Sequence, residues 1–477
     1  MLRKSSWIRP LLAALMVCAL PACKGGSGLP ASAVPPVTGA TNPLDVIQPL
    51  ASSGKIKHVI IIVQENRSFN NLFHGYPGAT TQSYGYTSTG KKVALKPVSI
   101  ATKWDLEHNP NGMEAACNGT GSVPGTDCRM NGFDKEFWKC GPGTNGGPCP
   151  IKLPPYAYVP HSQVKPYFDM AGQYVLTDQM YASNFDSESF ISHQYIIAGV
   201  NPEKSVGSPD GAWGCPGGKA DQIKILGKDR ALGPQTEEPC WNPTTLGDEL
   251  DAKSISWAFY AVALPGSKNV PLGSGSSNGH GIWSAYQAIQ HIYQGADWTN
   301  DVISPPQQFI TDVKNGNLRS VTWVTPTFAN SDHGGNDSTT GPSWVTSLVN
   351  TIGESQYWDS SAIFIFWDDY GGWYDPEPPK YLDNDGLGFR LPMLIISPYA
   401  KQGYVSHVHY EHGSILRFVE DQFGLPRMAA SDKRATSPAQ DCFDFNQAPR
   451  QFVPFTSSYD TNYFLHQPPD PRPPDSD

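Results

Sequence analysis

Hydrophobic residues recur along the chain in short runs that are typical of strands buried on both faces of a sheet. The clearest run is Val59–Val63, which consists of five consecutive β-branched residues. Similar runs cover residues 174–176, 254–260, 320–324, 362–366 and 392–397. Helical periodicity lies between several of them, as in Ser343–Gly353 and Ser414–Phe423. Strands that alternate with helices predict an α/β fold, in which a central, mainly parallel sheet is flanked by helices on both faces.

The segments between these elements predict the domain organisation. Residues 78–165 and 201–245 are rich in Gly and Pro, and we expect them to form long insertions around the sheet. Residues 24–54 are small and polar with prolines, which predicts a flexible tether. Residues 55–448 then form the α/β domain, and residues 449–477 an extended tail, because the chain ends in a proline-rich stretch.

The N-terminus predicts export. Residues 1–23 read as a signal peptide, with basic residues before the apolar run Leu11–Leu20, which is too short to span a bilayer stably. The sequence ending at Cys23 resembles a bacterial lipoprotein cleavage box, in which Cys23 would be lipidated and would tether the protein to a membrane. Pro21 is unusual in such a box, so cleavage without lipidation is the alternative. We therefore expect a periplasmic protein, an outer-membrane lipoprotein or a secreted protein.

The charge balance limits the class of partner. The formal net charge is −10, from 34 basic and 44 acidic side chains, and no long basic run occurs. Nucleic acid is therefore not an expected partner.

The cysteines agree with an oxidising compartment. Four of them lie in a loop rich in Gly, Asn and Pro, which favours local disulfides. The expected pairs are Cys117–Cys128, Cys140–Cys149 and Cys215–Cys240, which leaves Cys442 over. Zinc binding by the same loop is the competing interpretation, but none of the spacings is C-x2-C or C-x4-C.

Two of the predicted strands end abruptly in polar side chains. These are Glu65 and Asn66 after the first strand, and Asp368 and Asp369 after the strand 362–366. Ligands of open α/β sheets bind beyond the carboxyl ends of the strands. Adjacent acids there repel each other unless a cation or protons are bound. The alternatives are structural: a capped turn with Asn66 or Ser68 as N-cap, and an acidic turn.

A serine and several histidines are further candidates for chemistry. Ser189 precedes the helix-like segment Gln194–Gly199, and a hydroxyl at a helix N-terminus can act as a nucleophile. An N-capping serine is commoner, however, and chemistry does not separate Ser189 from the serines beside it. The histidines are His108, His280 and His333 in loops, and His407, His409 and His412 before a helix. Imidazole can bind a metal, protonate a leaving group or hold phosphate, and a structural role is the alternative for each.

Taken in order, these segments resemble the bacterial phosphoesterase family that contains phospholipases C and related acid phosphatases. The resemblance rests on five motifs that span roughly residues 56–446: Glu65-Asn66-Arg67-Ser68-Phe69, Ser189 four residues before His193, Ser331-Asp332-His333, Trp367-Asp368-Asp369-Tyr370-Gly371-Gly372, and the helix start His412–Phe418. The resemblance implies a fold similar to that of the alkaline phosphatase superfamily.

The resemblance also implies roles for the candidate residues. Glu65, Asn66, Asp368 and Asp369 would hold a divalent metal ion, with Ser189 as both ligand and nucleophile. His108, His280 and His333 would contact the phosphoryl group and help the leaving group depart. The expected function is hydrolysis of a phosphate ester by an exported, metal-dependent enzyme, either phospholipase C-like, acting at a phospholipid headgroup, or acid phosphatase-like.

Three departures from the family pattern leave those two branches open. Asn70 stands where the family has aspartate, Ser192 where it has asparagine, and Pro376 where it has histidine. A surface lipoprotein that binds phosphorylated ligands without catalysis is the alternative function. The intact set of acids around a serine argues against it. A sulfatase-like hydrolase is disfavoured, because no C/S-x-P-x-R signature lies near Ser189.

Overall fold

The computed structural model describes residues 54–140, 149–185, 188–200, 205–206, 214–220, 222–227, 229–262, 264–270, 283–470 and 472. The signal peptide and nearly all of the tether expected before residue 55 lie outside these residues. The described residues all belong to one unit, Pro49–Asp477. None of the helices in this described part is both long and apolar enough to traverse a bilayer.

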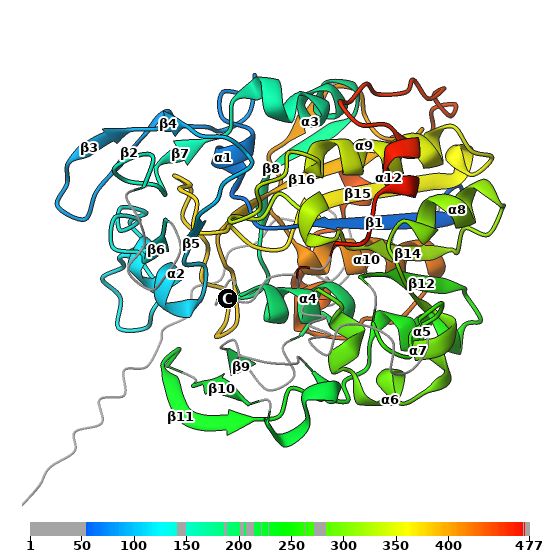
Figure 1. Ribbon diagram of the computed structural model, residues 1–477, viewed down its shortest axis with the longest axis horizontal. Helices are drawn as coiled ribbons and strands as arrows, with labels where there is room; N and C mark the ends of the chain where they lie inside the picture. The colour runs from blue at the N-terminus through cyan, green and yellow to red at the C-terminus, as the bar shows by residue number, and fades with distance from the viewer. Residues whose placement is uncertain are drawn as a thin grey trace, which may run out of the picture. The chain divides into compact units, whose positions relative to one another are not determined.

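A large, mostly parallel sheet forms the centre of the domain (Figure 1). Its strand order is β13–β12–β14–β1–β15–β16–β8–β17, with β18 also paired to β8. The strands are β1 (His58–Gln64), β8 (Val175–Tyr181), β12 (Trp257–Tyr260), β13 (Val302–Ile303), β14 (Val321–Val324), β15 (Ser361–Trp367), β16 (Arg390–Ile396), β17 (Tyr404–Ser406) and β18 (Tyr410–Glu411). Only β16 runs antiparallel to its neighbours within this described sheet. The predicted α/β class with a mainly parallel sheet is confirmed.

Helices cover both faces of the sheet (Figure 1). One layer contains α3 (His161–Gln173), α8 (Gln308–Lys314), α9 (Gly341–Gly353) and α12 (Thr461–His466). The other contains α4 (Ser189–Ala198), α5 (Leu246–Ala252), α6 (Gln290–Tyr293), α7 (Ala296–Asn300), α10 (His412–Phe423) and α11 (Ala430–Arg434). Because both faces are covered, β1 and β15 are buried almost throughout, which explains why they read as unbroken hydrophobic runs rather than as alternating patterns.

The two insertions carry small sheets of their own. The first holds β2 (Tyr84–Tyr86), β3 (Lys92–Ala94), β4 (Lys96–Pro97), β5 (Asp105–Leu106), α2 (Pro110–Cys117), β6 (Trp138–Lys139) and β7 (Ala157–Tyr158), and it follows α1 (Phe69–Leu72). The second holds β9 (Ser205–Val206), β10 (Ile223–Leu226) and β11 (Leu232–Glu237). The three predicted disulfides are all present, and Cys442 is a buried free thiol. Each disulfide closes a local loop within an insertion, which stabilises the fold by restricting the unfolded chain.

The expected C-terminal tail contains one short helix among its described residues, and it packs on the domain. This helix, α12, packs on α9, where the Phe464 ring is fully buried and lies 5.3 Å from the Trp344 ring. Upstream, the side-chain amide of Asn350 donates to the Phe455 carbonyl at 2.9 Å and accepts from the Phe455 N–H at 2.9 Å. The terminal prolines suggested a chain without structure, whereas the aromatic residues between them bury enough apolar surface to hold the tail on the domain.

This packing predicts a measurable contribution of the tail to stability. Phe464→Ala should lower the free energy of unfolding by about 3 kcal/mol, because it empties a fully buried aromatic site. The measurement is urea denaturation of the mature protein. Tyr463→Ala is the matched control on the same helix, since its side chain is 39% exposed, and its effect should stay below about 1 kcal/mol. Equal, small effects of both substitutions would show that the tail is not part of the cooperative unit.

Candidate functional site

The site lies where β1 and β15 end. These strands are parallel neighbours, with Gln64 opposite Trp367, so the residues that follow them emerge at the same edge of the sheet. The Asp368 N–H donates to the Gln64 carbonyl at 3.1 Å, which continues the pairing into the polar residues. Glu65, Asn66, Asp368 and Asp369 are all fully buried. The structure therefore brings together the two acidic strand ends that the sequence singled out.

Ser189 completes one half of the site. It is the first residue of α4 and is 1% exposed. Its hydroxyl donates to Asp369 Oδ2 at 2.9 Å and accepts from Asn66 Nδ2 at 3.0 Å. Asn66 Nδ2 also donates to Asp369 Oδ2 at 2.9 Å, so the three polar side chains form a closed triangle. The partial positive charge of a helix N-terminus favours a developing negative charge on this serine oxygen.

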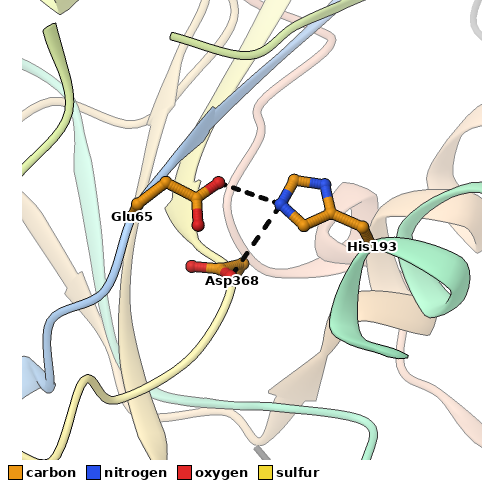
Figure 2. Close-up of side chains that lie close together, drawn as sticks. All are labelled: Glu65, His193 and Asp368. Carbon is orange, nitrogen blue, oxygen red and sulfur yellow. Dashed lines mark hydrogen bonds and ion pairs between the residues drawn. The ribbon is translucent and has the colours of Figure 1, made fainter. Parts of the chain in front are cut away.

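His193 forms the other half with two of the acids (Figure 2). Its Nε2 lies 2.9 Å from Glu65 Oε1 and 3.8 Å from Asp368 Oδ2. One ligand atom from each of the three residues lies within 4.8 Å of the others, and all three side chains are buried. The sequence interpretation used His193 only to locate Ser189 and missed it as a site residue. The available signal was the spacing, because residues four apart lie on the same face of a helix.

The donor set fits a divalent cation. Three carboxylates, from Glu65, Asp368 and Asp369, are buried at the same edge of the sheet. Buried like charges are unfavourable unless a positive charge or protons balance them. Carboxylate, imidazole, amide and hydroxyl atoms together are ligands that several divalent cations accept, so the donor set does not specify which one.

Two glycines after the acids allow close packing of the acidic loop. Gly371 has φ +60°, and a Cβ there would lie 2.2 Å from the Asn66 carbonyl oxygen. Gly372 has φ +71°, and a Cβ there would lie 2.4 Å from Leu106 Cβ. A larger residue at either position would push the loop off β1 or off the segment that leads to His108.

The structure brings His108 and His333 together. Both are 2% exposed, and their ring centroids lie 5.4 Å apart. The His108 Nδ1 lies 2.7 Å from the Leu106 carbonyl oxygen. Since a carbonyl only accepts, that nitrogen carries a proton, and Nε2 is the acceptor in the neutral ring. A cavity of about 180 Å³ lies against His108, and it is lined also by Asp105, Leu106, Glu107, Asn109, Phe137 and Trp138.

The loop of His333 is attached to both strand ends through Asp332. The Asp332 N–H donates to Gln64 Oε1 at 3.1 Å, and Asp332 Oδ2 accepts from Trp367 Nε1 at 3.2 Å. Arg67 donates from Nε to the Asp332 carbonyl at 2.7 Å. Burial raises the pKa of the Asp332 carboxyl to about 6, although hydrogen bonds and the Arg67 charge oppose the shift. Asp332 and Arg67 thus position the loop.

The other candidate residues either have contacts that suit a structural role or lie outside the described residues. Ser68 caps α1 by accepting from the Asn71 N–H at 3.3 Å, so the capped turn exists beside the site. His412 is buried at the start of α10, where burial lowers its pKa to about 3. His407 is 61% exposed and contacts Asp178 at 2.9 Å. His280 lies outside the described residues.

Comparison with known proteins agrees with this geometry. The model of the phosphoesterase family matches residues 56–426. Non-hemolytic phospholipase C of Burkholderia pseudomallei is 24% identical over 417 residues, which are 77% of this chain and 55% of that protein. This chain thus spans about half the length of that relative. Non-specific phospholipase C1 of Arabidopsis thaliana is 22% identical over 455 residues, which are 85% of this chain and 74% of that protein.

One solved structure and the range of the family match place this chain among known proteins. A structure described as a protein in the alkaline phosphatase superfamily from Vibrio parahaemolyticus aligns with a TM-score of 0.37 and 10% identity, covering 82% of this chain and 73% of that one. The family match extends over the sheet, α4 and all of α10, and so includes both acidic strand ends and Ser189. The chain belongs to the phosphoesterase family, whose chemistry is the hydrolysis of phosphoric ester bonds.

Proposed function

We propose that this protein is an exported, metal-dependent phosphoesterase in which Ser189 attacks phosphorus. The observation that carries the proposal is the Ser189 hydroxyl, hydrogen-bonded to Asp369 at 2.9 Å at the N-terminus of α4, beside the buried group of Glu65, His193 and Asp368. A binding protein needs acceptors and donors for phosphate, but it has no need of a buried serine whose proton points at a carboxylate.

The cation would be held by Glu65, Asn66, Asp368, Asp369 and Ser189, to which the structure adds His193 as a candidate ligand. Binding through Asn66 would use its oxygen, and therefore the opposite orientation of the side-chain amide to the one that donates to Ser189. When bound, a divalent cation lowers the pKa of a serine hydroxyl and screens the charge of the phosphoryl group.

The residues of the chain would then carry the reaction in two steps. Asp369 accepts the Ser189 proton as Oγ attacks phosphorus in line with the leaving oxygen, which forms a phosphoserine. His108 and His333, protonated at both ring nitrogens as imidazolium, donate to the phosphoryl oxygens, and one of them gives a proton to the leaving group. Water then attacks phosphorus from the side that the leaving group vacated, the histidine that protonated the leaving group takes a proton from this water, the Ser189 Oγ–P bond breaks, and Asp369 returns its proton to Oγ. Positioning and electrostatic stabilisation carry most of such a transfer.

The substrate is a phosphate ester, and two sources fit the site. The relatives are named phospholipases C, which favours a diester such as a phospholipid headgroup. The cavity beside His108 has room for a substituent on phosphorus and is lined by two aromatic rings and two carboxylates.

Export is supported by the N-terminal pattern together with the disulfides. Three structural disulfides in the described insertions are typical of proteins in an oxidising compartment. Residues 1–23 supply the signal peptide in this proposal, and lipidation of Cys23 would add a membrane tether.

The test is hydrolysis of p-nitrophenyl phosphate and of p-nitrophenyl phosphorylcholine by the mature protein, with and without chelator. We expect turnover of at least one ester. Chelation should reduce this turnover by more than about 100-fold, because mutating a residue that only contacts a metal ligand already costs roughly 10–100-fold. Added divalent cation should restore the turnover. Preference for the diester would favour the phospholipase C branch. No turnover of either ester would contradict the enzyme and leave the binding protein, and full activity after exhaustive chelation would contradict metal dependence alone.

A further inference from the structure

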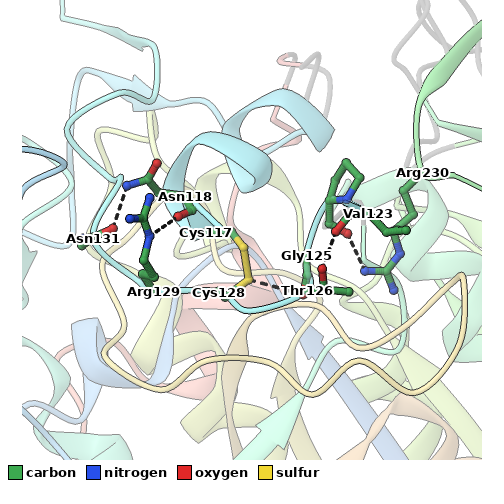
Figure 3. The surroundings of a disulfide bond; sticks show 10 residues. Cys117, Asn118, Val123, Gly125, Thr126, Cys128, Arg129, Asn131 and Arg230 are labelled. Atoms are coloured by element: carbon green, nitrogen blue, oxygen red, sulfur yellow. Dashed lines mark hydrogen bonds between the residues drawn. A yellow bond between two sulfur atoms is a disulfide. The ribbon is translucent and has the colours of Figure 1, made fainter. Parts of the chain in front are cut away.

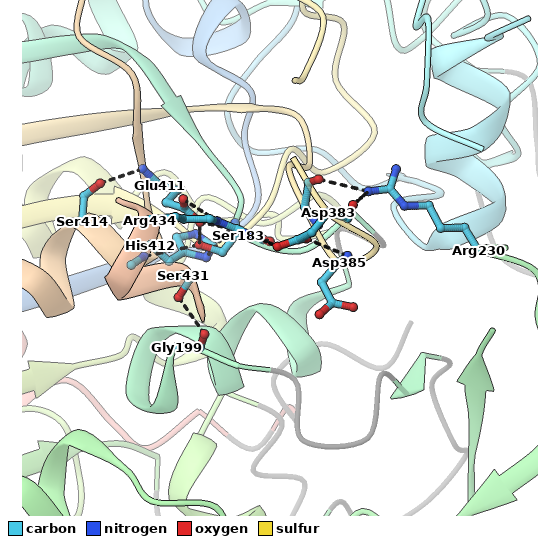
Figure 4. Close-up of polar contacts among 12 residues, drawn as sticks. Ser183, Gly199, Arg230, Asp383, Asp385, Glu411, His412, Ser414, Ser431 and Arg434 are labelled. Atoms are coloured by element: carbon cyan, nitrogen blue, oxygen red, sulfur yellow. Dashed lines mark hydrogen bonds and ion pairs between the residues drawn. The ribbon is translucent and has the colours of Figure 1, made fainter. Parts of the chain in front are cut away.

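Arg230, in the second insertion, is buried and donates hydrogen bonds to backbone carbonyls of two other segments. Arg230 is 3% exposed. Nε donates to the Asn384 carbonyl at 2.7 Å, Nη1 to the Pro124 carbonyl at 2.9 Å, and Nη2 to the Asp383 and Gly386 carbonyls at 2.8 and 3.1 Å. Figure 3 shows the first-insertion side of this contact, and Figure 4 the contact with the loop at Asp383. One guanidinium group thus joins three segments that are far apart in sequence.

Two aromatic rings hold the same guanidinium group. Its carbon lies 4.1 Å from the centre of the Phe185 ring and 4.5 Å from that of the Tyr381 ring. A guanidinium group desolvated between aromatic rings is bound more strongly than at a surface. The backbone of Arg230 has φ +58°, in the left-handed region that a non-glycine residue adopts at a cost of about 1 kcal/mol. The contacts of the side chain offset that strain.

Phe185 connects Arg230 to the nucleophile. It lies four residues before Ser189, in the segment that leads from β8 to α4. Its N–H donates to the Asp385 carbonyl, and Ala182 exchanges hydrogen bonds with the 388–389 backbone at 2.9 and 3.1 Å. Residues 182–185, which follow β8, are therefore paired along loop 381–389, and Arg230 contacts both partners.

A second arginine holds the same loop from the domain side. Arg434 of α11 pairs with Asp383, and it donates to Glu411 at 2.8 and 2.7 Å. Glu411 in turn accepts from the Ser183 hydroxyl at 2.9 Å. Figure 4 shows this network continuing to Arg230 through Asp383. Loop 381–389 is thus fixed between α11 and the insertions.

We propose that Arg230 is a positioning residue for Ser189: it locks residues 182–185 against loop 381–389 and so fixes where the serine oxygen stands relative to Asp369. The inference rests on the proposed function, because it assigns a purpose to that placement. A shift of about 1 Å in a reacting group can reduce a rate by about 100-fold.

The test compares Arg230→Ala with Arg450→Ala in the mature protein. Arg450 is a matched control, because it also donates to two backbone carbonyls, of Gln173 and Ala400 at 3.0 Å each, and its guanidinium carbon lies 4.5 Å from the Tyr174 ring centre. These contacts lie near the start of β8, at the other end of the strand from Ser189. Arg230→Ala should lower kcat for p-nitrophenyl phosphate by about 100-fold with KM changed less than about threefold, whereas Arg450→Ala should leave kcat within about twofold.

Hydrogen exchange supplies a readout that does not depend on activity. Amides of residues 183–193 should exchange faster in Arg230→Ala than in Arg450→Ala or the wild type. Arg230→Lys keeps the charge between the rings but loses most of the carbonyl contacts, so it should lie between wild type and alanine, and it replaces the alanine variant if that does not fold. Unchanged kcat and unchanged exchange in 183–193 would overturn the inference. If the wild type hydrolyses neither ester, the proposed function fails, while the exchange data still decide whether Arg230 positions this segment.

Discussion

Replacing Ser189 with alanine is expected to lower kcat for both nitrophenyl esters by on the order of 10⁴–10⁶-fold, as in hydrolases that lose a nucleophile or its partner acid. Alanine has no oxygen to attack phosphorus, and it leaves Asp369 without its hydroxyl partner. The fold should be retained, because alanine is the best helix former and position 189 is the first residue of α4. The loss would therefore report on chemistry rather than on folding.

Ser192→Ala is the matched control for this experiment. Ser192 lies one turn along the same helix, is equally buried, and exchanges hydrogen bonds with the Asn184 side chain at 3.0 and 3.1 Å. We expect its kcat to stay within about tenfold of wild type, since it contacts none of the acids in the described site. Rapid acid quench with mass spectrometry should detect phosphate on the peptide that contains Ser189 and not in Ser189→Ala. Full activity of Ser189→Ala would show that Ser189 is not the nucleophile. The family assignment would be unaffected.

The fold was predictable because its strands are buried on both faces. Val59–Val63 and the run at 362–366 contain little besides branched and aromatic residues, a composition that a two-sided core demands. Strand order was not predictable, because β1 pairs with strands roughly 260 and 300 residues away in sequence. The antiparallel direction of β16 was not predictable either, because its residues are as hydrophobic and buried as those of the parallel strands.

The site was predictable only as far as its polar residues interrupt hydrophobic runs. Glu65 and Asp368 stand out because each follows a strand at once. His193 does not, since it lies inside a helix whose every residue is buried, where a histidine resembles a core residue. Arg230 was not predicted, because the hydrogen bonds described for it go to backbone carbonyls, which any sequence supplies.

Asp368→Asn is expected to remove metal binding and, with it, activity. Asparagine has nearly the shape of aspartate, but it lacks the charge that attracts a cation. In the group of Glu65, His193 and Asp368, Glu65 would then be the remaining acid. The loss of kcat should exceed the roughly 10–100-fold typical of residues outside the ligand set. Metal content per chain, measured by plasma mass spectrometry after dialysis, should fall in parallel.

Stability separates this effect from simple damage to the fold. In chelator, Asp368→Asn should be at least as stable as the wild type, because it removes one of several buried like charges. With cation added, the wild type should gain thermal stability by mass action and the variant should not. Asp375→Asn is the contrast, since Asp375 is equally buried but paired with Arg390 at 2.9 Å, and breaking that pair should destabilise the protein by about 3–5 kcal/mol with metal content retained. An Asp368→Asn protein that keeps its metal and its cation-dependent stability would place the cation away from this carboxylate.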